Sequence, residues 1–151
     1  MADADHSPAF WSSLATALRS DPGVVFDLYN EPHDISWSCW LNGCWTARGW
    51  KARGWKAAGM QSLLDAVRST GATQPVLAAG LNWGGDLSGW LTHEPSDPDH
   101  QLAASAHIYS CSACNTVTCS SPPSPPSPPP SPSSPARSAK PTAPPPSSTP
   151  T

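Results

Sequence analysis

The composition of this 151-residue chain changes near residue 120, and the change limits what can fold. Residues 120–151 contain no Leu, Ile, Val or aromatic residue, and 14 of the 20 Pro residues lie among them. A segment with so little apolar surface to bury does not offset the entropy lost on ordering, so we expect a disordered Pro/Ser-rich tail. The folded domain is therefore expected within residues 1–119, which hold all eight Trp residues.

Charge and hydropathy argue against two classes of partner. The formal net charge is −3 and the chain has no basic run, which argues against nucleic acid. No apolar stretch reaches the roughly 18 residues that a membrane-spanning helix needs. The first residues also lack the basic region and apolar segment of a signal peptide. We therefore expect no nucleic-acid partner, no membrane partner and no signal peptide in this chain.

Three short apolar runs have the length and residue types of buried strands, and they cover residues 24–29, 76–79 and 102–109. Apolar residues at helical spacing predict one helix with Ser7 as its N-cap and a second helix that ends near Gly71. Between the first strand and the second helix we expect a Trp-rich loop (Trp37, Trp40, Trp45).

Strands that alternate with helices predict a parallel sheet and an α/β fold. Polar and aromatic residues gather where the three predicted strands end, at Asn30–Glu31, Asn82–Trp83 and His107–Tyr109. In a (β/α)₈ barrel the active site is built at these strand ends, but a closed barrel needs about 250 residues. We therefore expect a partial barrel of about three strands that does not close.

Glu31 is the residue with the most direct chemical interpretation. It closes an apolar strand within an Asn-Glu-Pro tripeptide. Glycosidic bond cleavage uses two carboxyl groups, one of which protonates the leaving oxygen. Burial and a neighbouring carboxylate raise the pKa of such an acid, so that it holds its proton near neutral pH. A Glu in this tripeptide also suits a helix cap or a turn, so the tripeptide alone leaves both interpretations open.

Three segments in order supply the missing context: VVFDLYNEPHD (residues 24–34), GLNWGGDLSGW (residues 80–90) and SAHIY (residues 105–109). Over residues 3–119 the chain resembles glycoside hydrolase family 5, the cellulase-type endoglucanases. This resemblance implies a (β/α)₈ barrel, of which the chain supplies about strands 4–6 with their helices. It also implies retaining hydrolysis of a β-1,4-glucan polysaccharide, without cofactor or metal, by a monomeric and extracellular parent enzyme.

The same resemblance implies roles for six residues. Glu31 is expected to be the general acid/base, and Asn30 is expected to hydrogen-bond the sugar 2-hydroxyl. His107 and Tyr109 are expected to line the cleft, with Tyr109 near the nucleophile, although a histidine at such a position can also be a core residue. The loop with Asn82 and Trp83 is expected to touch substrate.

Other residues have open interpretations. The indoles of Trp37, Trp40 and Trp90 suit stacking on sugar rings, and they also suit the core. Asp27 lies inside a predicted buried strand, so we expect it to make a structural hydrogen bond. Cys39 with Cys44, and Cys114 with Cys119, are close enough for local disulfides, but free thiols are an equal alternative. Cys111 and Cys114 alone are a weak zinc signal.

The chain departs from the family pattern at both ends. The first three strands of the barrel would precede residue 1, and a nucleophilic Glu would follow Tyr109 by about thirty residues in the family pattern. No Glu follows Glu94, and Pro/Ser sequence occupies that place. The tail is either a natural extended linker or the product of a frameshift. We expect the chain as written to be inactive and, with open sheet edges, marginally stable.

Three other functional readings stay open at this point. The Trp content and the tail suit a carbohydrate-binding module with a Pro/Ser linker. The tail also contains PxxP matches of the kind that PPII-binding domains recognise. A related barrel glycosidase acting on mannan or xyloglucan would share the same retained motifs.

The frameshift interpretation predicts a nucleotide sequence. If residues 131–142 are back-translated and the frame slides back one base, the string can read V-P/A-V-V-T-G-E-I-G-E-T-D, with Glu at the codon of Arg137. We expect sequencing of codons 105–151 and their flanks to show this Glu-containing motif in the shifted frame. A shifted frame full of stop codons would contradict the prediction and make the Pro/Ser segment a genuine one.

Overall fold

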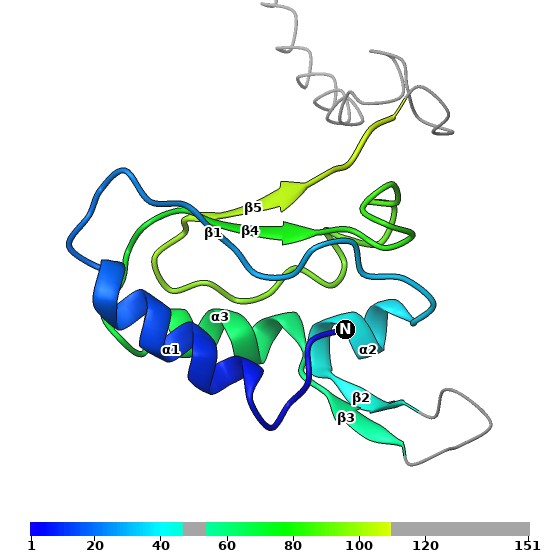
Figure 1. Cartoon of the computed structure of the whole chain (residues 1–151). Coiled ribbons are helices and arrows are strands. Elements are labelled where there is room, and N and C mark those ends of the chain that lie inside the picture. The colour runs from blue at the N-terminus through cyan, green and yellow to red at the C-terminus, as the bar shows by residue number, and fades with distance from the viewer. Residues whose placement is uncertain (47–53, 110–151) are drawn as a thin grey trace, which may run out of the picture. The chain divides into compact units, whose positions relative to one another are not determined.

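A computed structural model describes residues 1–46 and 54–109 of the chain (Figure 1). In chain order its elements are α1 (Ser7–Leu18), β1 (Phe26–Asp27), α2 (Trp37–Asn42), β2 (Cys44–Thr46), β3 (Trp55–Ala57), α3 (Met60–Arg68), β4 (Val76–Ala79) and β5 (Leu102–Ser105). No helix in these two ranges has the length and apolar character that crossing a bilayer requires. The predicted domain boundary at residue 119 and the predicted tail lie outside the described residues.

The main sheet has three parallel strands in the order β1–β4–β5, which confirms the predicted parallel α/β arrangement. The strand β4 has the predicted bounds. The strand β1 is shorter than the predicted residues 24–29, because it pairs with β4 alone and Val25 is 53% exposed. The strand β5 ends at Ser105, because the chain then turns toward the loop after β4, where the His107 amide donates to the Gly84 carbonyl.

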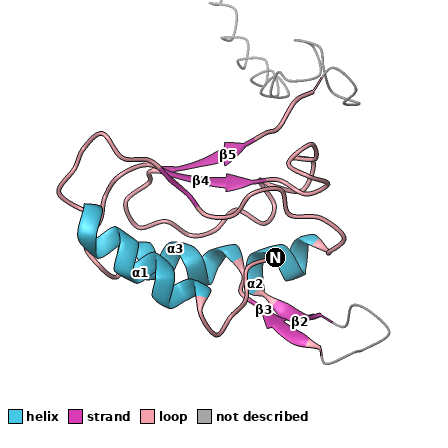
Figure 2. Cartoon of the chain, in the orientation of Figure 1, coloured by secondary structure: helices cyan, strands magenta, loops and turns pink. Residues whose placement is uncertain are grey.

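The core lies on one face of this sheet, where α1 and α3 pack (Figure 2). Side chains alternate between the faces of a strand, so the paired residues Phe26, Val76 and Leu102 point to the helices. The next row, Asp27 with Leu77 and Ala103, points the other way, and Asp27 and Ala103 are exposed. Within the described residues the sheet is open at β1 and β5, so no barrel closes there.

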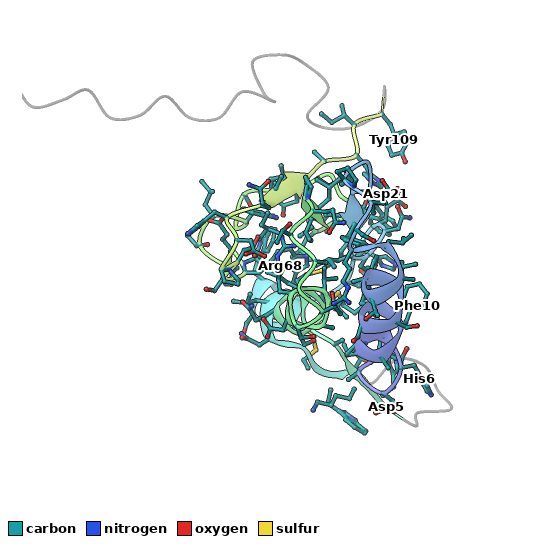
Figure 3. All side chains as sticks on the ribbon, turned by 90° about the vertical axis from the view of Figure 1, so that its left-hand side faces the viewer. Asp5, His6, Phe10, Asp21, Arg68 and Tyr109 are labelled. Atoms are coloured by element: carbon teal, nitrogen blue, oxygen red, sulfur yellow. A yellow bond between two sulfur atoms is a disulfide. The ribbon has the colours of Figure 1, made fainter. Side chains whose placement is uncertain are left out.

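The start of α1 differs from the prediction. Ser7 is the first helical residue, and His6 occupies the N-cap position. The Asp3 carboxylate orders the turn before the helix, because it accepts the His6 amide at 2.8 Å and the Ser7 hydroxyl at 3.1 Å. Trp11 faces the core while Phe10 is 58% exposed on the outer side of the helix (Figure 3).

The predicted Trp-rich loop is wrong. This stretch holds α2, which Ser36 caps by accepting the Cys39 amide, and the antiparallel pair of β2 and β3. A disulfide joins Cys39 at the centre of α2 to Cys44 at the start of β2, which confirms one of the two local pairings considered. The other cysteines lie outside the described residues. A cross-link over so short a segment limits the unfolded chain and favours this helix-to-strand turn.

Trp40 and Trp90 are core residues and not sugar platforms. Trp40 is fully buried and Trp90 is 5% exposed. Each indole N–H donates to a carbonyl of β4, Trp40 to Ala79 at 2.9 Å and Trp90 to Ala78 at 3.1 Å. The two rings therefore pack beside the central strand and satisfy polar groups near its carboxyl end.

A buried ion pair joins α3 to the two turns that start β4 and β5. The Arg68 guanidinium donates to both carboxylate oxygens of Asp97, at 2.7 and 2.9 Å, and to the carbonyls of Ala72 and Gln74. The two charged side chains are only 5% and 4% exposed. The Asp97 carboxylate also accepts the amide of Gln101, directly before β5. One cluster thus fixes where both strands begin.

The hydrogen bonds from Arg68 lower the pKa of Asp97 from 3.8 to about 2. A carboxyl group whose pKa is lower in the folded chain stabilises the fold at pH values above its unfolded pKa. That contribution is complete above about pH 4 and is lost as the pH falls toward 2.

We expect Arg68→Met to lower the free energy of unfolding by about 3–5 kcal/mol, because it leaves the Asp97 carboxylate buried without a counter-charge. Urea unfolding followed by tryptophan fluorescence measures the change. Asp65→Asn, on the exposed side of the same helix, is the matched control and should shift stability by less than about 0.5 kcal/mol. Equal effects of the two substitutions would show that the pair has no such role.

Candidate active site

Three of the predicted site residues meet at the carboxyl end of the sheet. The Tyr109 hydroxyl donates to Glu31 Oε1 at 3.0 Å, and His107 Nδ1 lies 2.9 Å from the same oxygen. Glu31 follows β1, while His107 and Tyr109 follow β5, 76 and 78 residues later in the chain. The Glu31 side chain is 26% exposed, and none of the described residues bonds its Oε2. The carboxylate is therefore held by one oxygen and open at the other.

The backbone at this cluster is unusual for non-glycine residues. Glu31 has a φ of +52°, in the left-handed region that costs an L-residue on the order of 1–3 kcal/mol. The loop after β4 approaches closely, because a Cβ built on Gly84 would lie 3.0 Å from the ring of His107. Glycine at position 84 thus lets that loop hold His107 through the bond between the His107 amide and the Gly84 carbonyl, 3.0 Å long.

Trp83 borders the cluster through the segment that carries Glu31. Its amide donates to the Pro32 carbonyl at 3.1 Å, and its indole stacks on the His33 ring with centroids 4.7 Å apart and planes 9° apart. Trp83 is 50% exposed, so part of the indole remains open to a ligand. Sequence reasoning missed His33, because only the fold shows that its ring pairs with Trp83.

Two predicted site residues have no contact with Glu31. Asn82 is exposed, and its amide lies 3.5 Å from Asp86 Oδ2 within its own turn. Asn30 is exposed next to Glu31, and its side chain has no hydrogen bond to a described residue. Asp27 lacks the predicted structural hydrogen bond among the described residues, and although its side chain is exposed, the atoms around it partly desolvate its carboxyl group and raise its pKa. In the part of the chain that the structure describes, no group of three metal-binding side chains occurs.

A sequence model of the cellulase family, glycosyl hydrolase family 5, matches residues 2–125. The chain belongs to this cellulase family. The match covers both segments that form the site, the Asn-Glu-Pro-His stretch and the His-Ile-Tyr stretch. It confirms the resemblance to family 5.

Individual relatives of this family 5 chain are endoglucanases. It is 32% identical to endo-beta-1,4-glucanase A of Emericella nidulans over 111 residues, covering 70% of the chain and 29% of the relative. It is 29% identical to endoglucanase 1 of Robillarda sp. over 108 residues, covering 66% of the chain and 24% of the relative. The chain therefore spans 24% to 29% of the length of these curated relatives.

Solved structures agree with this placement. An endo-beta-1,4-glucanase of Xanthomonas axonopodis pv. citri with a triple mutation matches with a TM-score of 0.53 and 26% identity, over 76% of this chain and 35% of that one. XacCel5A in complex with cellopentaose matches with a TM-score of 0.51 and 26% identity, over 76% and 36%. These matches support the expected barrel architecture, of which the described residues form an open, three-stranded part.

The pKa of Glu31 in this cellulase-family chain shifts in the direction opposite to the one that a proton donor needs. The hydrogen bond from His107, followed by that from Tyr109, lowers the pKa of Glu31, because both bonds favour the charged carboxylate. The sequence-based expectation of a raised pKa is therefore not met in this chain. Partial exposure keeps the opposing effect of burial small.

We expect Tyr109→Phe to raise the pKa of Glu31, because it removes a hydrogen bond to the charged carboxylate, and His107→Ala to raise it further. Carbon-13 NMR of labelled glutamate side chains measures the pKa, and Glu31 and Glu94 are the only two Glu residues in the sequence. Tyr29→Phe is the control, because among the described residues the hydrogen bonds to Glu31 come from His107 and Tyr109. An unchanged pKa of Glu31 in both variants would contradict the geometry described here.

Proposed function

We propose that the parent protein of this chain hydrolyses β-1,4 bonds of a β-glucan by a retaining double displacement, with Glu31 as its general acid/base. The observation that carries the proposal is the convergence of His107 and Tyr109 on Glu31 Oε1 within a family 5 chain. In this mechanism one carboxyl group protonates the leaving oxygen and later takes a proton from the attacking water.

The geometry suits that role. His107 and Tyr109 fix the orientation of the carboxyl group from one side, which leaves Oε2 to face the glycosidic oxygen. Asn30, exposed beside Glu31, is suited to bond the sugar 2-hydroxyl, since an amide both donates and accepts. Trp83 and Asn82 offer an exposed indole and an exposed amide on the neighbouring loop.

These 151 residues contain no second Glu beside Glu31 that could act as the nucleophile. A retaining enzyme needs a second carboxylate about 5–5.5 Å from the acid. The only other Glu, Glu94, is exposed in the segment between β4 and β5 and makes no contact with Glu31. A second negative charge would also raise the pKa of Glu31, which here is lowered. We infer that these 151 residues by themselves are inactive, and that a frameshift over Arg137 explains the missing nucleophile.

Substrate, location and assembly are parts of the same proposal. The endo-beta-1,4-glucanase relatives and the cellopentaose complex support a β-glucan polysaccharide over mannan or xyloglucan. We propose a monomeric, extracellular parent. The helices and the parallel sheet are arguments against a carbohydrate-binding module, because such modules are usually all-β.

The test is hydrolysis of carboxymethylcellulose by two proteins. The purified 151-residue chain should release no reducing ends above background. A chain with the shifted frame restored and the upstream strands added should be active, and Glu31→Gln should lower its kcat at least about 10³-fold. Glu94→Gln is the matched control and should leave activity unchanged. Activity of the short chain that Glu31→Gln abolishes would overturn the inactivity inference, while an active restored enzyme indifferent to Glu31→Gln would overturn the proposed role.

A further inference from the structure

The end of α2 carries an Asn-Gly dipeptide, Asn42–Gly43. Asn42 is the only one of the four Asn residues in the sequence that is followed by glycine. An asparagine before glycine is especially prone to deamidation, because a residue without a Cβ leaves its backbone nitrogen accessible to the preceding side chain. Asn42 is exposed and takes no part in the Glu31 cluster.

The deamidation of an Asn-Gly dipeptide is intramolecular and needs only water as a reactant. The glycine nitrogen loses its proton to solvent base and attacks the side-chain carbonyl carbon of the asparagine. A bond forms between these two atoms, the bond from that carbon to Nδ2 breaks, and the amide nitrogen takes up protons and leaves as ammonia. Water then opens the five-membered imide at either carbonyl, which leaves aspartate or isoaspartate in place of the asparagine.

The folded end of α2 keeps the two reacting groups apart. Asn42 Nδ2 donates to the Ser38 carbonyl at 3.2 Å, so the side chain points back along the helix and away from Gly43. The Gly43 amide donates to the Cys39 carbonyl at 2.8 Å, so the attacking nitrogen is already engaged. The attack needs the reacting atoms about 3–3.5 Å apart and aligned. The last turn of α2 therefore has to open before Asn42 reacts.

The Cys39–Cys44 disulfide opposes that opening. Its two half-cystines lie on either side of the dipeptide, so Asn42 and Gly43 are inside the loop that the cross-link closes. Cys39 contributes both one sulfur of the disulfide and the carbonyl that accepts the Gly43 amide. The helix continues directly into β2, which runs beside β3 (Figure 1). A cross-link over so short a segment removes many of the open conformations in which the reaction could occur.

Packing fixes the glycine and makes the modification disruptive. A Cβ built on Gly43 would overlap the Ala57 carbonyl, and Gly43 has a φ of +75°, so a residue with a side chain does not fit there. Gly59, at the N-cap of α3, is so close that a Cβ built on it would lie 2.5 Å from the carbonyl carbon of Asn42. An isoaspartate adds one atom to the backbone at this contact, so α2 has to move relative to α3.

We propose that Asn42 is a site of spontaneous deamidation, which the disulfide-closed end of α2 suppresses and which opening of the disulfide releases. A dithiol reductant converts Cys39 and Cys44 to thiols and is itself oxidised to a disulfide. Reoxidation of the two cysteines reverses that step, but it does not restore the lost amide. A transient reduction thus leaves a permanent change in the chain. This inference is independent of the proposed hydrolysis.

The test follows the deamidation of the full 151-residue chain by peptide mass spectrometry at mildly alkaline pH. Cys39→Ala combined with Cys44→Ala is expected to speed the reaction at Asn42 at least about tenfold, which corresponds to about 1.4 kcal/mol of easier opening. A dithiol reductant should have the same effect on the unsubstituted chain. Asn42→Gln is the matched control and should stay unmodified, because glutamine would have to form a larger ring. Asn82 is an internal reference that should react slowly in every sample, since Trp83 follows it.

Circular dichroism shows whether each sample is folded. If the double variant and the reduced chain do not fold, Ser36→Ala carries the comparison, because it removes the cap of α2 and keeps the disulfide. This variant should also speed the reaction, by a smaller factor, and an unchanged rate would overturn the proposal. So would an unchanged rate in a folded double variant. Equal rates at Asn42 in the intact chain and in the urea-unfolded chain would show that the fold gives no protection. Absence of reaction in urea would show that Asn42 is not a modification site.

Discussion

The register of β4 against its two neighbours determines where the site residues lie. Phe26 pairs with Val76 and Val76 with Leu102, so the three strands begin at the same level and run in the same direction. The residues that follow β1 and β5 then meet, although 76 residues separate Glu31 from His107. Arg68 and Asp97 fix the strands at their starts, and Trp40 and Trp90 pack where β4 ends. The geometry at Glu31 thus depends on contacts that are not part of the chemistry.

The groups around Glu31 determine whether its carboxyl group is charged. Two hydrogen bonds favour the carboxylate, and no second carboxylate opposes them. A general acid needs the reverse balance, in which a neighbouring negative charge keeps the proton on. Family membership and catalytic competence are therefore separate properties, because the motif supplies the positioned carboxyl group and a different strand must supply the charge that tunes it.

Much of the fold could be read from the sequence, with limits that have physical causes. β4 was predicted to the residue, because the run Val76–Ala79 is apolar on both faces and has a partner strand on each side. β1 and β5 were predicted too long, since lateral strands pair on one side alone. The helix α2 was missed, because it depends on the Ser36 cap and on a disulfide whose formation the sequence left open.

The sequence predicts which residues form the site, but it does not predict the direction in which the pKa of Glu31 shifts. The sequence motifs identify Glu31, His107 and Tyr109 as site residues. The direction of the pKa shift of Glu31, in contrast, depends on hydrogen bonds made across the sheet. His33 carries no motif role of its own, and its importance appears only in the stack with Trp83. Local sequence patterns do not contain such pairings.

The open face and edges of the sheet have a consequence for reassembly. Within the described residues β1 and β5 leave hydrogen-bonding groups without a strand neighbour, and the row through Asp27 and Ala103 is uncovered. In a closed barrel the face of the sheet opposite the helices points inward and both lateral strands have a strand neighbour. A separately expressed chain carrying the remaining strands would find both edges available, so this part of the fold is suited to complementation in trans, as one half of a split enzyme.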